Sequence, residues 1–145
     1  QQDKLEAMVR RRNLESHVFF MGRIEHSDLP RYYNCSDLFV MPSKTEIPDV
    51  EGFGIVFLEA NACGKPVIGS TSGGIPDAVL DKKTGILVEE NNEKELANVI
   101  EQLINNPEWS NQLGQNGRKR VEEHLNWDAV SRKLYRKMND LYLSS

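Results

Sequence analysis

Residues 54–69 read GIVFLEANACGKPVIG, and this stretch indicates a helix followed directly by a strand. Apolar residues dominate positions 54–63, and Gly64 stands where a helix that ends in a left-handed turn takes glycine. Pro66 then opens a short apolar run, which is typical of a strand buried on both faces. We therefore predict a helix over 54–63 and a strand over 66–69.

The same alternation of helices and short apolar strands continues in both directions along the chain. Further strands are predicted over 18–21, 38–41 and 86–88, and further helices over 3–12, 29–34, 75–80, 93–104, 108–123 and 127–142. Strands of this kind, separated by helices, indicate a parallel sheet that is covered on both faces. The predicted fold class is therefore α/β, a doubly wound and Rossmann-like parallel sheet.

Polar residues mark where several of these helices begin. Ser27 and Asp28 can cap the second predicted helix, and Asn126 can cap the last one, because their side chains accept from free backbone amides. Asn92 precedes the helix over 93–104, and Glu95 follows three residues later, which is the spacing of a capping box.

The composition argues against several classes of function. The chain has 145 residues, of which 39% are hydrophobic and 28% charged, and its formal net charge is −4. No apolar run approaches the roughly 20 residues that cross a membrane, and a nucleic-acid partner would require a basic surface. The basic runs 10–12 and 118–120 have acidic neighbours in helical patterns, so we interpret both as solvated faces.

The two cysteines, Cys35 and Cys63, match no metal-ligand spacing, so no metal site is predicted. Both lie in apolar segments, and we expect them to be buried, reduced thiols. Reduced cysteines, together with an N-terminus that does not resemble a signal peptide, favour a cytoplasmic protein.

In a doubly wound sheet, ligands bind beyond the carboxyl ends of the strands. This rule selects the loops over 22–27, 42–52, 70–74 and, less directly, 89–92. The paired glycines Gly73 and Gly74 in the third loop could admit a sugar or a phosphate, although an ordinary strand-to-helix turn explains them equally well.

The loop over 42–52 runs directly into a helix and is the most informative of the four. The backbone amides of Phe53, Gly54 and Ile55 open this helix, where unpaired amides and the helix dipole favour a diphosphate. Ser43 and Lys44 stand earlier in the loop, and Lys44 is the cation nearest to the phosphate position. A solvated loop lysine is the simpler interpretation of Lys44.

Two carboxylates flank the start of this helix. Glu51 precedes the turn, and Glu59 follows Ile55 by four residues, on the same helical face. An ionised carboxylate only accepts hydrogen bonds and has two oxygens, which suits it to a pair of neighbouring hydroxyls. Glu59 can therefore bind ribose and Glu51 the group beyond the phosphates, whereas a solvated helix residue is the alternative for Glu59.

The run from Glu51 to Ile68 resembles the donor-binding motif of retaining glycosyltransferases of the GT-B fold, family four. The signature of that family is two glutamates with seven residues between them, which Glu51 and Glu59 satisfy. The resemblance extends over Tyr33 to Ser43, 73–77, 84–88 and 96–127. It therefore covers nearly the whole chain in an ordered series of motifs.

The resemblance implies a role for each matching residue. Glu51 would be the catalytic-site glutamate that contacts hydroxyls of the donor sugar, and Glu59 would bind the ribose. The amides of 53–55 would hold the sugar and the diphosphate. The loop Gly22, Arg23 and Ile24 looks like the one that lines the base. Ser43, Lys44, Gly73 and Gly74 complete the predicted donor-binding set, and neither a metal nor another cofactor is implied.

The long insert before Glu51 looks like that of bacterial mannosyltransferases that act on phosphatidylinositol lipids, which would imply GDP-mannose. The residues themselves leave a GDP-sugar and a UDP-sugar open. Glu46 in this insert is a second candidate for the first glutamate, although its spacing to Glu59 is wrong.

The resemblance also implies that residues 1–145 are a partial domain. An acceptor domain, and a basic segment that neutralises the diphosphate, are expected upstream of Gln1, so the isolated fragment should not turn over. Through that acceptor domain the enzyme could contact the inner face of the membrane. A sheet without its first strands leaves an open edge, where a second copy could pair.

The alternative is a non-catalytic nucleotide-sugar-binding or scaffolding module of a split transferase. A dinucleotide-dependent oxidoreductase is a poor match, because no Gly-x-Gly-x-x-Gly follows a first strand.

Overall fold

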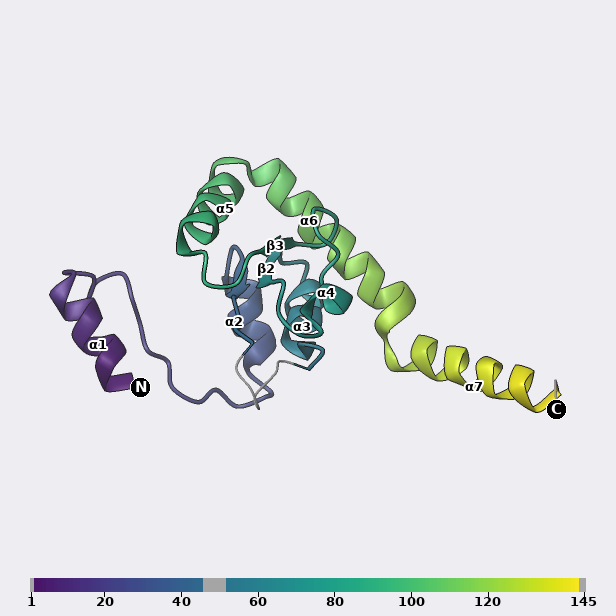
Figure 1. The fold of residues 1–145 in the computed structure, drawn as a ribbon. Coiled ribbons are helices and arrows are strands. Elements are labelled where there is room, and N and C mark those ends of the chain that lie inside the picture. The colour runs from purple at the N-terminus through teal and green to yellow at the C-terminus, as the bar shows by residue number, and fades with distance from the viewer. Residues whose placement is uncertain (1, 46–51, 144–145) are drawn as a thin grey trace.

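A parallel three-stranded sheet lies at the centre of the computed structural model, which describes residues 2–45 and 52–143 (Figure 1). The strands β1 (Phe39–Met41), β2 (Val67–Ser70) and β3 (Ile86–Val88) lie in that order across the sheet. Ile68 is in register with Val40 on one side and with Ile86 on the other. The predicted α/β class and parallel sheet are confirmed.

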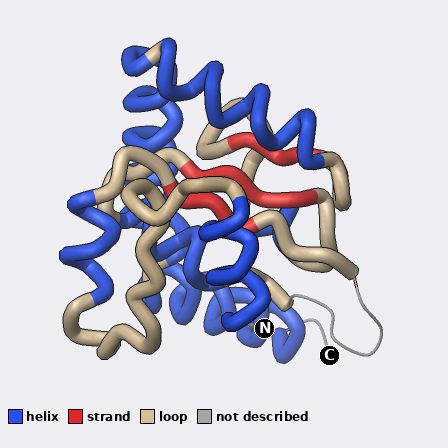
Figure 2. Tube along the Cα trace, turned by 90° about the vertical axis from the view of Figure 1, so that its left-hand side faces the viewer, coloured by secondary structure: helices blue, strands red, loops and turns tan. Residues whose placement is uncertain are grey.

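Helices cover both faces of this sheet, as Figure 2 shows with the strands in red between blue helices. The helices are α1 (Gln2–Arg11), α2 (Leu29–Cys35), α3 (Ile55–Ala62), α4 (Ile75–Ala78), α5 (Glu93–Asn105), α6 (Pro107–Arg120) and α7 (Trp127–Leu143), with one π-helical turn at Val121–Leu125. Most predicted boundaries are therefore right to within a few residues.

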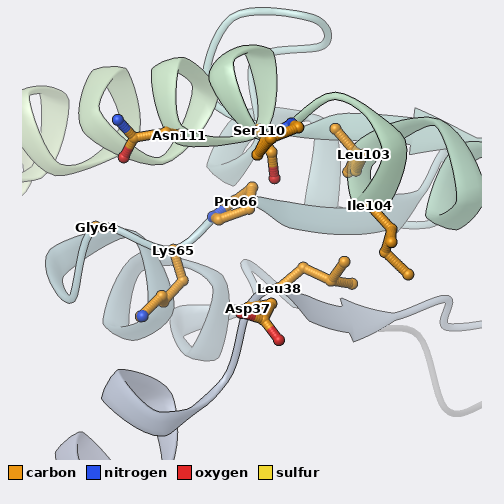
Figure 3. A pocket seen from close by; sticks show the side chains of 10 residues that line it. Asp37, Leu38, Gly64, Lys65, Pro66, Leu103, Ile104, Ser110 and Asn111 are labelled. Atoms are coloured by element: carbon orange, nitrogen blue, oxygen red, sulfur yellow. The ribbon is translucent and has the colours of Figure 1, made fainter.

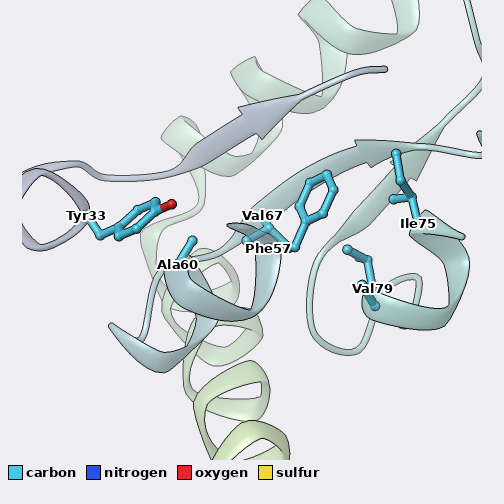
Figure 4. Packing of buried hydrophobic residues seen from close by; sticks show 7 residues of the cluster. Tyr33, Phe57, Ala60, Val67, Ile75 and Val79 are labelled. Atoms are coloured by element: carbon cyan, nitrogen blue, oxygen red, sulfur yellow. The ribbon is translucent and has the colours of Figure 1, made fainter. Parts of the chain in front are cut away.

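Two hydrophobic clusters form the core, one on each face of the sheet. On one face α3 and α4 pack against β2, and α2 packs against α3. Phe57 and Ile75 are fully buried here, and Figure 4 shows this layer from Tyr33 to Val79. On the other face α5 and α6 cover Ile68 and β3 with Leu103 and Leu113. Val67 and Ile68 are neighbours in β2 but belong to different clusters, because successive side chains of a strand point to opposite faces.

Glycines allow α6 to pack directly on the end of α3. A Cβ added to Gly114 would lie 2.1 Å from the carbonyl oxygen of Gly64, and one added to Gly117 would lie 2.4 Å from Cγ of Asn61. The Asn61 amide donates to the carbonyl oxygens of Lys65 and Thr84, so the contact region has no unsatisfied buried side-chain polar atom among the described residues.

The predicted caps have mixed outcomes. Asn92 accepts from the amide of Glu95, and Asn126 accepts from the amide of Ala129, so both N-caps are confirmed. The second half of the predicted capping box differs, because the Glu95 carboxylate accepts from the Asn92 side chain and the Glu89 amide. Asp28 makes no side-chain cap hydrogen bond with α2 and forms an ion pair with Arg31 instead. The left-handed conformation predicted at Gly64 is present, with φ of 71°.

The strand predicted over 18–21 is wrong. These residues form no ladder in the structure, and Phe19 is 72% exposed. The sheet contains only β1, β2 and β3 among the described residues, and none of these strands pairs with 18–21. The apolar pattern of 18–21 is therefore not sufficient for a strand here, because a strand also requires a hydrogen-bonding neighbour.

Two further expectations need correction. Cys35 is exposed rather than buried, because it ends α2 on the outer side, whereas Cys63 is partly buried and both thiols are free. The basic run 118–120 is only partly a solvated face. Arg118 pairs with Glu122, but the Arg120 guanidinium turns inward and donates to the carbonyl oxygens of Asp77 and Ala78 at the end of α4.

The close contact of α6 with Gly64 can be tested with Gly114→Ala. The methyl group would overlap the Gly64 carbonyl, and overpacking costs about 1–3 kcal/mol, more than the roughly 0.5–1 kcal/mol by which alanine favours a helix. We expect a net loss of about 1–2 kcal/mol in the free energy of unfolding by urea titration. The adjacent, exposed Gln115→Ala is the control, and equal effects of the two variants would contradict the close contact.

Candidate functional site

The loops that follow β1 and β2 meet at the start of α3. A Cβ added to Gly74 would lie 1.9 Å from the carbonyl oxygen of Gly52 and 3.4 Å from Cα of Phe53, so the two glycine turns are in contact. Gly73 has φ of 51°, in the left-handed region that favours glycine. Two of the loops that sequence reasoning selected therefore form one surface at the carboxyl edge of the sheet.

The aromatic ring of Phe57 packs against the turn that leads into α3. Gly54 is the N-cap residue, with φ of 72°, and a Cβ there would lie 2.7 Å from Cδ2 of Phe57. The Phe57 amide donates to the Gly54 carbonyl at 3.0 Å. The amides that precede Phe57 at this helix start have no intrahelical acceptor. Phe53 and Ile55 are exposed, Ile55 to 65%, whereas Gly54 between them is buried. The predicted group 53–55 therefore lies at the positive end of the helix dipole, with its two outer residues at the surface.

Glu59 lies one turn further along α3 and is partly buried. The Tyr33 hydroxyl on α2 donates to its Oε2 at 3.0 Å. Glu59 also borders a cavity of about 230 Å³, the Glu59 cavity, which is lined by His26, Leu29, Pro30, Tyr33, Glu59, Ala62 and Cys63. A merely solvated helix residue does not describe this environment, since the carboxylate has a specific partner and faces a cavity.

A polar cluster joins all three loops beyond the strands, and sequence reasoning missed it. The Thr45 amide donates to Oε2 of Glu90 at 2.8 Å, and the Thr45 hydroxyl donates to Oε1 at 2.6 Å. The Ser72 hydroxyl lies 2.9 Å from that of Thr45. Because the Thr45 proton is directed to Glu90, Ser72 is the donor in this pair. We call Thr45, Ser72 and Glu90 the Thr45 clasp.

The Thr45 clasp stabilises the ionised form of Glu90. The hydrogen bond from the Thr45 hydroxyl, followed by the one from its amide, lowers the pKa of Glu90. Close by, the Ser70 hydroxyl donates to the Ser43 carbonyl at 2.5 Å, and this bond holds the same loop against β2. The predicted loops over 42–52, 70–74 and 89–92 contained these residues, but their pairing depends on the register of the strands.

The remaining predicted residues are less closely joined to this surface. Lys44 is exposed in the loop between Ser43 and Thr45. Glu51 and Glu46 lie outside the described residues. No hydrogen bond or ion pair in the described ranges connects the loop 22–24 with α3, although His26, two residues later, lines the Glu59 cavity. The structure therefore brings together the α3 start, Glu59 and the loop over 70–74.

A larger cavity, of about 470 Å³, lies at the opposite edge of the sheet (Figure 3). Leu38 and Pro66, which directly precede β1 and β2, line it together with Leu103 and Ile104 of α5. It is thus at the amino ends of the strands, where doubly wound sheets do not bind their principal ligand, and we do not include it in the candidate site.

Comparisons with known proteins identify the family. The family model described as Glycosyl transferases group 1 matches residues 1–120. The GDP-mannose-dependent monoacylated alpha-(1-6)-phosphatidylinositol monomannoside mannosyltransferase of Corynebacterium glutamicum is 37% identical over 135 residues, which cover 90% of this chain and 35% of the relative. This chain therefore belongs to the glycosyl transferases group 1 family.

Solved structures share the architecture. Sucrose-phosphate synthase from Thermosynechococcus elongatus has a TM-score of 0.82 at 37% identity, over 99% of this chain and 35% of that chain. Anabaena Alr3699/HepE, solved in complex with UDP, has a TM-score of 0.84 at 25% identity, over 95% of this chain and 36% of that chain. The fold is that of GT-B glycosyltransferases, and the chain spans about a third of the length of these relatives.

None of the described helices is both long enough and apolar enough to cross a bilayer.

The Thr45 clasp predicts a specific pH dependence. The folded pKa of Glu90 is lowered, so its contribution to stability is present above the usual glutamate pKa of about 4.3 and is lost as the pH falls through the folded value. We expect the difference in unfolding free energy between wild type and Glu90→Gln to shrink from about pH 7 to pH 3. Glu89→Gln is the control, since Thr45 keeps both bonds. A difference that is constant over this range would contradict the clasp.

Proposed function

We propose that this chain is the donor-binding part of a retaining glycosyltransferase, which transfers a sugar from a nucleotide sugar to a lipid or polysaccharide acceptor. The observation that carries the proposal is the arrangement at the carboxyl edge of the sheet. There the start of α3 and the partly buried Glu59 lie one helical turn apart, beside the contact of Gly74 with Gly52. Membership of the glycosyl transferases group 1 family supports the reaction class.

Each part of the surface has a role in this proposal. The amides of 53–55 bind the diphosphate, and Glu59 accepts hydrogen bonds from the ribose hydroxyls. Gly73 and Gly74 leave room beside the phosphates, while Ser43 and Lys44 border them. When the bond between the sugar and the diphosphate breaks, negative charge builds on the leaving diphosphate, and preorganised amides stabilise that charge.

The first glutamate and the base loop complete the proposed site. Glu51 contacts hydroxyls of the donor sugar, and the loop Gly22, Arg23 and Ile24 lines the base. His26 lies two residues beyond this loop and lines the cavity beside Glu59, which supports a base position on this side of α3. No metal takes part in the proposed reaction, because the amides and basic side chains elsewhere in the enzyme supply the positive charge.

The donor in this proposal is a GDP-sugar or a UDP-sugar. GDP-mannose is favoured by the mannosyltransferase relative and by the insert before Glu51, whereas the structural match to HepE with UDP supports a UDP-sugar. We propose a cytoplasmic enzyme that contacts the inner face of the membrane through its acceptor domain. Calorimetric titration of the complete protein with GDP, UDP and ADP distinguishes the bases.

The role of Glu59 is tested with Glu59→Gln in the complete protein. Losing a charged acceptor of ribose hydroxyls should weaken binding of GDP or UDP about 10- to 100-fold, since hydrogen bonds to charged groups contribute about 1.5–3 kcal/mol. Glu101→Gln, an exposed change on α5, is the matched control. Wild-type affinity for both nucleotides in Glu59→Gln would remove Glu59 from the site.

The role of Glu51 is tested by a split between binding and turnover. We expect Glu51→Ala to lower kcat by at least about a hundredfold, as the loss of a transition-state contact does, while the affinity for the nucleoside diphosphate stays within about twofold of wild type. Glu46→Ala is the comparison variant, because its spacing to Glu59 is wrong. A large loss of kcat in Glu46→Ala, with none in Glu51→Ala, would transfer the role to Glu46.

A further inference from the structure

The Glu59 carboxylate is held by a side chain from a different helix. Tyr33 lies 26 residues earlier, on α2, and its hydroxyl donates to Oε2 of Glu59 at 3.0 Å. Only 8% of Tyr33 is exposed, and its ring belongs to the hydrophobic cluster under α3. A rigid, buried ring with its polar tip on one carboxylate oxygen restricts the directions in which that carboxylate can point.

A row of aromatic rings fixes Tyr33 relative to the start of α3. The Tyr33 ring packs edge-on against Phe39 of β1, with centroids 5.6 Å apart, and Phe39 packs in the same way against Phe57, again at 5.6 Å. Phe57 in turn lies against Gly54 at the helix start. Figure 4 shows Tyr33 and Phe57 in this layer, on either side of Ala60. The position of the Tyr33 hydroxyl is therefore coupled to the proposed diphosphate position by packed side chains.

The hydrogen bond uses only half of the carboxylate. An ionised carboxylate has two accepting oxygens, and Oε1 of Glu59 has no hydrogen-bond partner among the described residues. Tyr33 stays a donor, because burial and then the bond to Glu59 raise the pKa of its hydroxyl well above the ordinary range. The arrangement keeps Oε2 occupied and leaves Oε1 as the acceptor for another group.

We propose that Tyr33 is a positioning residue for donor recognition: it holds Oε2 of Glu59 so that Oε1 is presented to a ribose hydroxyl. The inference rests on the proposed function, since it assumes that Glu59 binds ribose. Tyr33 itself touches no part of the donor. Its hydroxyl acts by aiming the carboxylate, whereas its ring stabilises the layer beneath α3.

The test compares nucleotides with and without ribose hydroxyls. Affinities of the complete protein for GDP and UDP, each paired with its 2′,3′-dideoxy analogue, are measured for wild type, Tyr33→Phe, Glu59→Gln and the double variant. Tyr33→Phe keeps the ring and removes only the hydroxyl. Tyr32→Phe, on the exposed neighbouring tyrosine, is the matched control.

We expect Tyr33→Phe to weaken binding of the ribonucleotide about tenfold, as loss of one hydrogen bond to a charged group does, and to leave binding of the dideoxy analogue unchanged. In the Glu59→Gln background the same change should have little further effect, because the two residues act together. Tyr32→Phe should match wild type for both nucleotides.

Three results would overturn the inference in distinguishable ways. If Tyr33→Phe lowers the affinity for the ribonucleotide and for its dideoxy analogue equally, the Tyr33 hydroxyl has only a structural role. If Glu59→Gln lowers the affinity for the ribonucleotide but Tyr33→Phe does not, Tyr33 is not a positioning residue, while the proposed function stays intact. If Glu59→Gln binds GDP and UDP as tightly as wild type does, Glu59 does not bind ribose. The proposed role of Tyr33 is then rejected together with the proposed ribose site.

Discussion

The candidate site depends on the packing of the Phe57 ring between the start of α3 and the sheet. It is fully buried, and it lies against Gly54 at the start of α3 and against Gly69 in β2, where an added Cβ would come 2.7 Å and 3.1 Å from the ring. Because neither glycine has a side chain, the helix start can approach the sheet this closely. The same ring packs against the left-handed turn at Gly54, from which α3 begins.

Around this apolar centre, the polar groups at the carboxyl edge have two different functions. The Thr45 clasp connects the loops beyond the three strands to one another, so it determines the shape of the surface. The Tyr33–Glu59 pair instead leaves Oε1 of Glu59 without a hydrogen-bond partner among the described residues. This oxygen is the acceptor that we propose for a ribose hydroxyl.

Elements whose signals are local were predictable. The left-handed turn at Gly64 and the caps at Asn92 and Asn126 each depend on a few adjacent residues, and all three are confirmed. The segment 18–21 has an equally clear apolar pattern but forms no strand, because a strand also needs a neighbour. The inward position of Arg120 was not predictable from local sequence either. Its partners are the carbonyl oxygens at the end of α4, which lie more than forty positions away in sequence.

By itself, the sequence determined the α/β class, selected loops at the carboxyl edge and predicted roles for the two glutamates that flank the start of α3. Periodicity and residue type are enough for these, because they depend on short-range geometry. Only the tertiary structure decided that Gly74 lies on Gly52, that Thr45 binds Glu90 and that Tyr33 holds Glu59. Such pairs join distant segments, and their identity depends on strand register and helix packing, which no local pattern encodes.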